Sequence, residues 1–190
     1  MLEHAPLLGA THSKHALGTW IYLASFHASR VTEPLAFRVD LADLGADRPS
    51  GPLLSYDWRS GQMERVAADA GFDLSLRALD WDYRVLCPIA CVGDVEIAIV
   101  GDAARYATAG DKRIASVRAS ESGVTIDLLG AANERLRITG WATRAPVRAV
   151  AHDPGGAQPI EVVWDAASGR FDLEHTLPSC GWTQLRIATA

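Results

Sequence analysis

The feature that most constrains the fold of this chain is an alternation of apolar and polar residues with a period of two. The alternation recurs along almost the whole sequence. Successive side chains of a β-strand point to opposite faces, so this pattern predicts strands with one buried and one solvated face. It is clearest in FRVDL (37–41), FDLSL (72–76), VEIAI (95–99), VTIDLL (124–129), LRI (136–138), IEVVW (160–164) and FDLEHTL (171–177).

Turn sequences separate these segments. DRPSGP, RSGQ, DPGGAQP and AASGR supply the Gly and Pro residues that hairpin turns need. Short strands at this spacing predict an all-β fold, an antiparallel β-sandwich. Only GQMERVAADAG (61–71) has a weakly helical pattern, which a single turn or an irregular loop fits equally well.

The chain of 190 residues has room for one large domain or two small ones. The alternation lapses at YATAGDKR (106–113), where small and polar residues dominate. We therefore expect a polar lead-in at 1–15, a first β-sandwich module at 16–110 and a smaller second module at 111–190. A single continuous sandwich is the alternative.

Composition excludes several classes of partner. The net charge is −5 and the sequence contains no run of Lys or Arg, which argues against a nucleic-acid surface. No apolar run approaches the roughly 20 residues of a membrane-spanning helix, and the first residues lack the pattern of a secretion signal. Three cysteines, an odd number, favour reduced thiols. We expect a cytoplasmic protein without nucleic-acid or membrane partners.

The segment LDWDYRVLCPIAC (79–91) raises the question of an acidic catalytic pair. On an extended strand, the odd-numbered residues from Leu79 to Cys87 form an apolar face, and Asp80, Asp82 and Arg84 form a solvated one. The two aspartates lie about 6.7 Å apart along such a strand, close to the spacing of inverting glycosidases. They project in parallel from one face and do not flank a bond, so we interpret them as a solvated strand surface.

Metal and nucleophile chemistry find little support in the sequence. Cys87 and Cys91 form a C-x3-C pair without the two further ligands that structural zinc needs, and we interpret both as free thiols. His4, His12 and His15 cluster near the start, which a polar terminus explains. No G-x-S-x-G motif accompanies the serines. We therefore predict no catalytic residue, no metal and no cofactor.

The six tryptophans divide into two groups by strand phase. Trp20, Trp58, Trp81 and Trp164 are in phase with apolar neighbours or lie in an apolar run, and we expect them in the core. Trp141 and Trp182 are in phase with polar residues, while Ile138, Leu185 and Ile187 point the other way. An exposed tryptophan can stack on a sugar ring, so Trp141 and Trp182 are the candidate carbohydrate-binding residues. Docking onto a neighbouring domain, or cover by a loop, is the alternative.

The ordered set of segments resembles the C-terminal region of family thirty-six glycoside hydrolases, the α-galactosidases, raffinose synthases and seed-imbibition proteins. The resemblance covers most of residues 16–190. It rests on WIYLASFHAS, FRVDLADLG, SYDWRSGQ, LRALDWDYRVLCPI, VEIAIVGDAARYATAGDKRIASV and PIEVVWDAASGRFDLEHTL. In that family the catalytic acids lie in an upstream (β/α)8 barrel, which no segment here matches. The resemblance implies a β-rich accessory region whose partner is that barrel, and transfers no catalytic residue.

Three functional hypotheses follow. The first is a non-catalytic accessory β-domain that supports a glycosidase barrel, and it predicts an apolar surface patch, either exposed or buried in a homo-oligomer. The second is a carbohydrate-binding module that uses Trp141 or Trp182. The third, a self-contained enzyme, requires a concave site with converging acids or a nucleophile and base, which the sequence does not supply.

Overall fold

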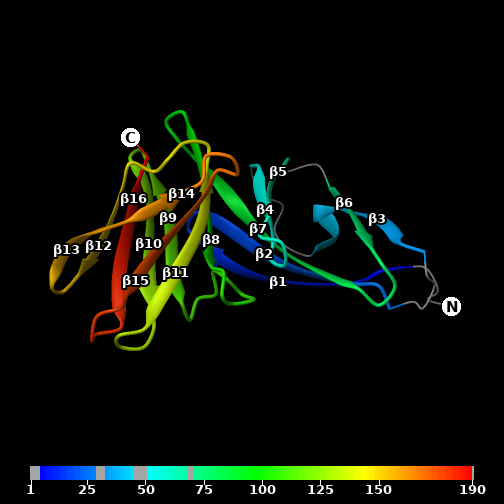
Figure 1. Ribbon diagram of the computed structural model, residues 1–190, viewed down its shortest axis with the longest axis horizontal. Helices are drawn as coiled ribbons and strands as arrows, with labels where there is room; N and C mark the ends of the chain where they lie inside the picture. Colours follow the sequence, from blue (N-terminus) through cyan, green and yellow to red (C-terminus); the bar gives the residue numbers. More distant parts are fainter. Residues whose placement is uncertain (1–4, 29–32, 45–50, 68–70, 190) are drawn as a thin grey trace.

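The protein is built from antiparallel β-structure (Figure 1). The computed structural model describes residues 5–28, 33–44, 51–67 and 71–189. These residues form sixteen strands and one short 3-10 helix, η1 (Leu41–Leu44), and they contain no α-helix. Every strand pair is antiparallel. The prediction of an all-β antiparallel sandwich is therefore confirmed.

The largest sheet has nine strands within the described residues. Along its main path it runs in the order β1-β2-β7-β8-β11-β15-β14, and β4 and β5 branch from β7. Its strands are β1 (Leu7–His15), β2 (Gly18–Phe26), β4 (Leu53–Asp57), β5 (Met63–Val66), β7 (Trp81–Val92), β8 (Val95–Asp102), β11 (Arg135–Ala142), β14 (Val162–Trp164) and β15 (Arg170–Thr176).

A five-stranded sheet packs against one half of the large sheet and closes the sandwich. Its order is β13-β12-β16-β10-β9. The apolar residues of the alternating segments, such as Ile126, Ile138 and Leu185, point between the two sheets and are fully buried. The strands of this second sheet are β9 (Ile114–Ser120), β10 (Gly123–Leu129), β12 (Arg148–Asp153), β13 (Gly156–Ile160) and β16 (Trp182–Ala188).

Close backbone packing at Gly140 is part of this core. A Cβ atom at this position would lie 2.2 Å from Cζ of Phe171 and 2.8 Å from the carbonyl oxygen of Ala98. Phe171 is fully buried and faces Gly140 across the β11–β15 pair. Only a residue without a side chain fits here, because a Cβ atom essentially never lies within 3 Å of a heavy atom outside its chain neighbours.

The other half of the large sheet extends away from the sandwich (Figure 1). There β1, β2 and β7 continue, and a two-stranded sheet of β3 (Leu35–Val39) and β6 (Phe72–Leu76) packs on one face together with η1. A second core of buried residues lies between them and includes Ile21, Leu23 and Leu86. This extension is the part of the fold that positions the candidate site.

One segment differs in secondary structure from the sequence expectation. The weakly helical segment 61–71 contains β5, a strand that pairs with β4, so the helical interpretation is wrong; residues 68–70 lie outside the described residues. Val66 of β5 is buried in the second core, and this tertiary contact outweighs the local preference.

Strand pairing and a shared core cross the expected module boundary. Residues 7–15 of the expected lead-in form strand β1. The expected module boundary at 110/111 lies between β8 and β9, and the pairing of β8 with β11 crosses it. Buried residues from both sides share one core. In the described part of the chain, no helix is long and apolar enough to cross a membrane.

Candidate functional site

A row of apolar side chains crosses the three strands of the extension and is open to solvent. Leu7 of β1 lies directly opposite Phe26 of β2, and Phe26 lies directly opposite Trp81 of β7. Opposite residues of an antiparallel pair point to the same side of the sheet, so the three side chains are neighbours. Their exposed fractions are 53%, 38% and 39%. Together with exposed Gly9 and Ala24 they form a surface that we call the bare face.

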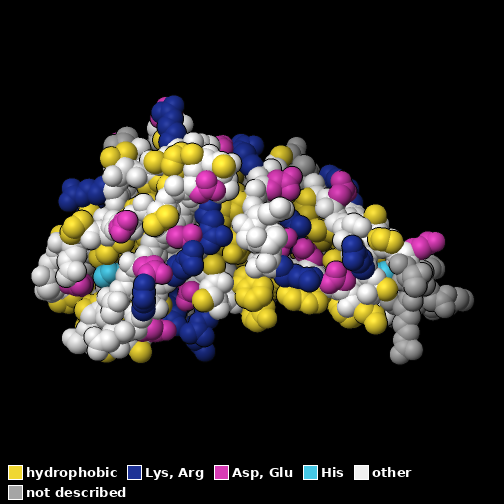
Figure 2. Space-filling view, in the orientation of Figure 1, with side chains coloured by type: hydrophobic (Ala, Val, Ile, Leu, Met, Phe, Trp, Pro, Cys, Tyr) yellow, Lys and Arg dark blue, Asp and Glu magenta, His cyan; other side chains and the backbone are white. Residues whose placement is uncertain are grey.

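Strand parity explains why this face is bare. On β2, Ile21 and Leu23 point to the face that β3, β6 and η1 cover, and both are buried. Trp20 and Tyr22 point to the opposite face, where the main core covers them. Beyond Tyr22 the sandwich ends, and Ala24 and Phe26 continue the same face without cover in the described structure. In Figure 2, hydrophobic side chains gather along the lower border of the extension.

Trp81 is held in place on the bare face by charged neighbours. The guanidinium of Arg59 lies over the Trp81 ring, 4.9 Å from its centroid, and Arg59 forms an ion pair of 2.8 Å with Asp80. Arg59 also donates a hydrogen bond of 2.9 Å to the carbonyl oxygen of Trp81. These contacts fix the ring without burying it, so an apolar surface is presented at low entropic cost.

An aromatic cluster continues the bare face toward the sandwich. The rings of Trp58 and Tyr106 stack with centroids 4.8 Å apart, and Tyr83 packs edge-on against both. Trp58 donates a hydrogen bond to the carbonyl oxygen of Ala103, and the Tyr83 hydroxyl donates one to that of Tyr106. Burial raises the pKa of Tyr83 to about 12. Tyr106 is 60% exposed, so a rigid aromatic surface faces solvent here.

The structure corrects the interpretation of residues 79–91. Leu79 lies in a turn with φ of 59°, and β7 begins only at Trp81. Trp81 was expected in the core and is exposed, because the sandwich does not reach this end of β7. Asp82 was expected on a solvated face and is buried beside Arg84, whose Nε lies 3.1 Å from it. Burial raises the pKa of the Asp82 carboxyl, and Arg84 offsets only part of that effect.

The other expected core tryptophans lie in or against the main core. Trp20 is fully buried and donates a hydrogen bond of 2.7 Å to the carbonyl oxygen of Ile99, so that prediction is confirmed. Trp58 and Trp164 are partly buried against the same core.

The two candidate carbohydrate-binding tryptophans lie on opposite outer faces of the sandwich and do not form one site. Trp141 is on β11 of the large sheet and is half-buried, because the backbone of Gly169 packs on its indole. Trp182 is on β16 of the smaller sheet and is 38% exposed. Beside it on the same face, Gln184 donates a hydrogen bond of 2.9 Å to Asp127.

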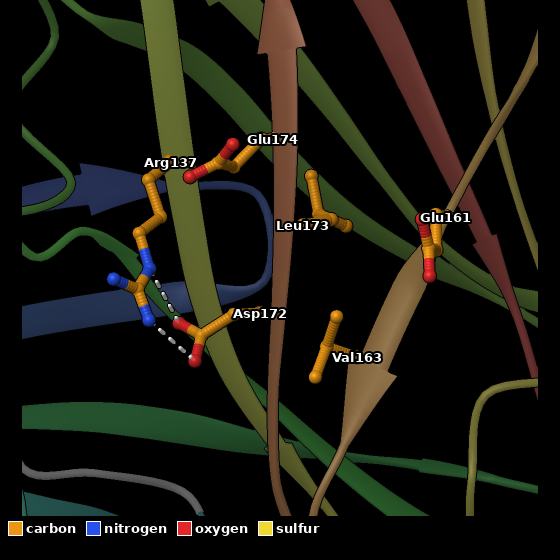
Figure 3. A pocket seen from close by; sticks show the side chains of 6 residues that line it. All are labelled: Arg137, Glu161, Val163, Asp172, Leu173 and Glu174. Carbon is orange, nitrogen blue, oxygen red and sulfur yellow. Dashed lines mark hydrogen bonds and ion pairs between the residues drawn. The ribbon is translucent and has the colours of Figure 1, made fainter.

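A shallow pocket of about 350 Å³ lies on the outer face of β11, β15 and β14 (Figure 3). Arg137 contacts Asp172 through two hydrogen bonds, of 3.2 Å and 3.0 Å. Burial alone raises the pKa of Asp172, but hydrogen bonds from Arg137, Arg170 and Thr139 outweigh it and hold the pKa below its usual value. A carboxylate so occupied is a poor general base. Glu161 and Val163 line the rest of this charged surface.

The sulfur and histidine candidates are not brought together. Cys87 is buried and Cys91 exposed on the same strand, about 13 Å apart along it, too far to share a metal. Within the described residues, no group of three or more His, Cys, Asp or Glu side chains is arranged to hold a metal ion. His12 is exposed on β1. At the end of β1, Nε2 of His15 donates a hydrogen bond of 2.8 Å to the carbonyl oxygen of Ala109. His4 lies outside the described residues.

No family model matches the chain, and no curated protein matches it.

The bare face itself was not found from the sequence. Its signal is weak, because Leu7 lies in a segment without alternation and Phe26 ends a run that is apolar on both faces. Only the register of β1, β2 and β7 places Leu7, Phe26 and Trp81 in one row.

Proposed function

We propose that this chain is a non-catalytic accessory β-domain that docks onto a partner protein domain through the bare face. The observation that carries the proposal is the unequal cover of one sheet. One face of the β1-β2-β7 extension is packed against a second core, and the other exposes Leu7, Phe26 and Trp81 side by side. A contiguous apolar patch of this kind marks an interaction surface.

The chemistry of the bare face favours a protein partner. It combines an aliphatic side chain, Leu7, with two aromatic ones, and the nearest charges, Arg59 and Asp80, are paired with each other. Aromatic anchors with a paired polar rim are typical of protein interfaces. From the resemblance described above, the proposed partner is the (β/α)8 barrel of a family thirty-six glycosidase-like protein. Hydrolysis or transfer of α-galactosyl groups would be the activity of that barrel.

A position-specific photo-cross-link in the native host tests this proposal. The photoreactive amino acid p-benzoylphenylalanine replaces Phe26 in one variant and Val163 in a matched control. Val163 is 65% exposed and lies on the outer face of the other half of the sheet. We expect residue 26, and not residue 163, to cross-link to a protein that contains a glycosidase barrel. No adduct at residue 26, or the same adducts at both positions, contradicts the proposal.

A carbohydrate-binding module is the second candidate, and one observation favours it: Trp182 is exposed beside the Gln184–Asp127 hydrogen bond on an otherwise polar sheet face. Aromatic rings beside side-chain amides and carboxylates are suited to sugar binding. Tryptophan fluorescence titrated with galactose, raffinose and other α-linked oligosaccharides tests it. Saturable shifts that Trp182→Ala abolishes and Trp141→Ala retains support this function. No shift with any sugar removes it.

The compartment that we propose is the cytoplasm. Cys87, Cys91 and Cys180 are all free thiols, and two of them are exposed. Exposed free thiols are typical of reducing compartments.

A further inference from the structure

A second shallow pocket, of about 400 Å³, lies at one end of β8, β11 and β15. The loop that follows β8 contributes Arg105 to it, and the turn before β11 contributes Glu134. It adjoins the pocket of Figure 3, with which it shares Arg137 and Glu174. No residue of the bare face lines it, and neither does Trp182. We call this separate surface the Arg105 pocket.

Two carboxylates in the Arg105 pocket are each held through one oxygen. Oδ1 of Asp102, whose side chain is 6% exposed, accepts a hydrogen bond of 3.2 Å from the backbone N–H of Ala104. Oε2 of Glu134 accepts one from Nη1 of Arg113 and one of 3.0 Å from the backbone N–H of Ala131. The hydrogen bond from Arg113 is the main cause that lowers the pKa of Glu134 to about 2, so this carboxylate stays ionised.

The guanidinium of Arg105 faces the other oxygen of each carboxylate without reaching it. Its Nε lies 3.9 Å from Oδ2 of Asp102, and its Nη2 lies 3.9 Å from Oε1 of Glu134. Nε of Arg113 lies 3.7 Å from the same Asp102 oxygen. Hydrogen bonds of this kind span about 2.7 to 3.2 Å, so these contacts are ion pairs without a hydrogen bond. One donor and two acceptors therefore surround a space that no hydrogen bond crosses.

A group that completes this network has to accept and donate hydrogen bonds at once. The Nε–H and one Nη2–H of Arg105 point in parallel and need two acceptors, while the two carboxylate oxygens need two donors. A carboxylate or phosphate would accept from Arg105, but Asp102 and Glu134 repel it. An ammonium would donate to the carboxylates, but it cannot accept. Hydroxyls do both, and two hydroxyls on neighbouring carbons match the two parallel N–H groups.

We propose that the Arg105 pocket binds a saccharide through two hydroxyls on neighbouring carbons, which accept from Arg105 and donate to Asp102 and Glu134. The pocket has the size of a small-molecule site, and Ala104 and Leu136 add apolar atoms to its lining for the C–H groups of a sugar ring. Among the described residues no aromatic side chain lines it, so a nucleoside would find no stacking partner for its base. The proposal does not rest on docking through the bare face.

Nuclear magnetic resonance titrations test the proposal. Nitrogen–proton correlation spectra follow the Nε–H of Arg105 and the backbone amides of residues 103–106 while methyl α-glucopyranoside or methyl α-galactopyranoside is added. Sorbitol, a linear polyol, and trimethylene glycol, whose two hydroxyls are separated by a third carbon, are the controls. We expect saturable shifts with at least one glycoside and none with trimethylene glycol. No saturable shift with either glycoside, or equal shifts with trimethylene glycol, overturns the proposal. Saturation with sorbitol alone overturns the assignment to a saccharide.

The variant Arg105→Lys tests the two parallel donors. Lysine keeps the positive charge but lacks the parallel N–H groups, so glycoside binding should weaken by about tenfold or more. Arg144→Lys is the matched control, because Arg144 follows the other end of β11, is 67% exposed and pairs with Asp94. It should bind like wild type, and so should Trp182→Ala, which separates this pocket from the candidate on the smaller sheet. Circular dichroism checks the fold of each variant. Unchanged affinity in Arg105→Lys, or an equal loss in Arg144→Lys, overturns the proposal.

Discussion

The bare face predicts that two positions on strand β2, three residues apart, respond very differently to truncation. Leu23 is fully buried in the second core, and Phe26 is exposed on the opposite face. Leu23→Ala loses about 2.5 kcal/mol of transfer free energy and leaves a cavity, so the free energy of unfolding should fall by about 3 to 4 kcal/mol. Phe26→Ala loses only cross-strand contacts with Leu7 and Trp81, which contribute about 1 kcal/mol or less.

Urea denaturation followed by circular dichroism measures this contrast. With a denaturant dependence of about 2 kcal/mol per molar urea, the midpoint should fall by about 1.5 to 2 M for Leu23→Ala and by about 0.5 M or less for Phe26→Ala. The slopes should match wild type, which keeps the comparison valid. Equal losses for the two variants would mean that Phe26 is buried in the isolated chain, and the reasoning about the bare face would be refuted.

Three further measurements examine other parts of the fold. The Cβ atom of Gly140→Ala would collide with Phe171, so this change should lower the free energy of unfolding by about 3 kcal/mol or more. Gly9→Ala is the control, because no atom lies within 4 Å of its Cβ position, and it should change the free energy of unfolding by about 0.5 kcal/mol or less. Equal urea midpoints for the two variants would contradict the close packing at Gly140. Burial lowers the pKa of His175 below its usual 6.5, so the unfolded state binds the proton more tightly. Stability should be fully present above about pH 6.5 and fall as the pH drops below it, and His175→Gln should flatten that profile; an unchanged profile would contradict the assignment. Burial raises the pKa of the Cys87 thiol, whereas Cys91 and Cys180 are exposed. A thiol reagent should therefore modify Cys91 and Cys180 in the native chain and Cys87 only in denaturant. Rapid modification of all three cysteines in the native chain would contradict the burial of Cys87.

Period-two alternation predicted the strands that have one face in a core. In β10 and β6, alternate side chains such as Ile126 and Leu74 are buried, because each of these strands has one covered face and one solvated face. The prediction fails where a strand changes its surroundings along its length. Trp81 and Val85 share one face of β7, yet the main core covers Val85 and not Trp81. The alternation of residues identifies the face to which a side chain points, but it does not show where along the strand other residues stop covering that face.

The candidate site depended on information that one sequence does not contain. Trp182 was placed correctly on a polar face by its phase with Gln184, since β16 alternates without interruption. Trp141 was also placed in phase with polar residues, but its cover by Gly169 comes from a turn nearly thirty residues away in sequence. The row of Leu7, Phe26 and Trp81 exists only through the register of three strands. Register depends on tertiary packing, so the bare face became visible only in the structure.

Hydroxyl-radical footprinting of the bare face tests the central claim most directly. Side-chain oxidation is measured by mass spectrometry on the purified chain and on the chain isolated with its partner from the native host. Phe26 and Trp81 should be oxidised readily in the purified chain and protected in the native complex, while exposed Val147 and Val163 should react equally in both. Equal oxidation of these two residues in both samples would contradict docking through this face.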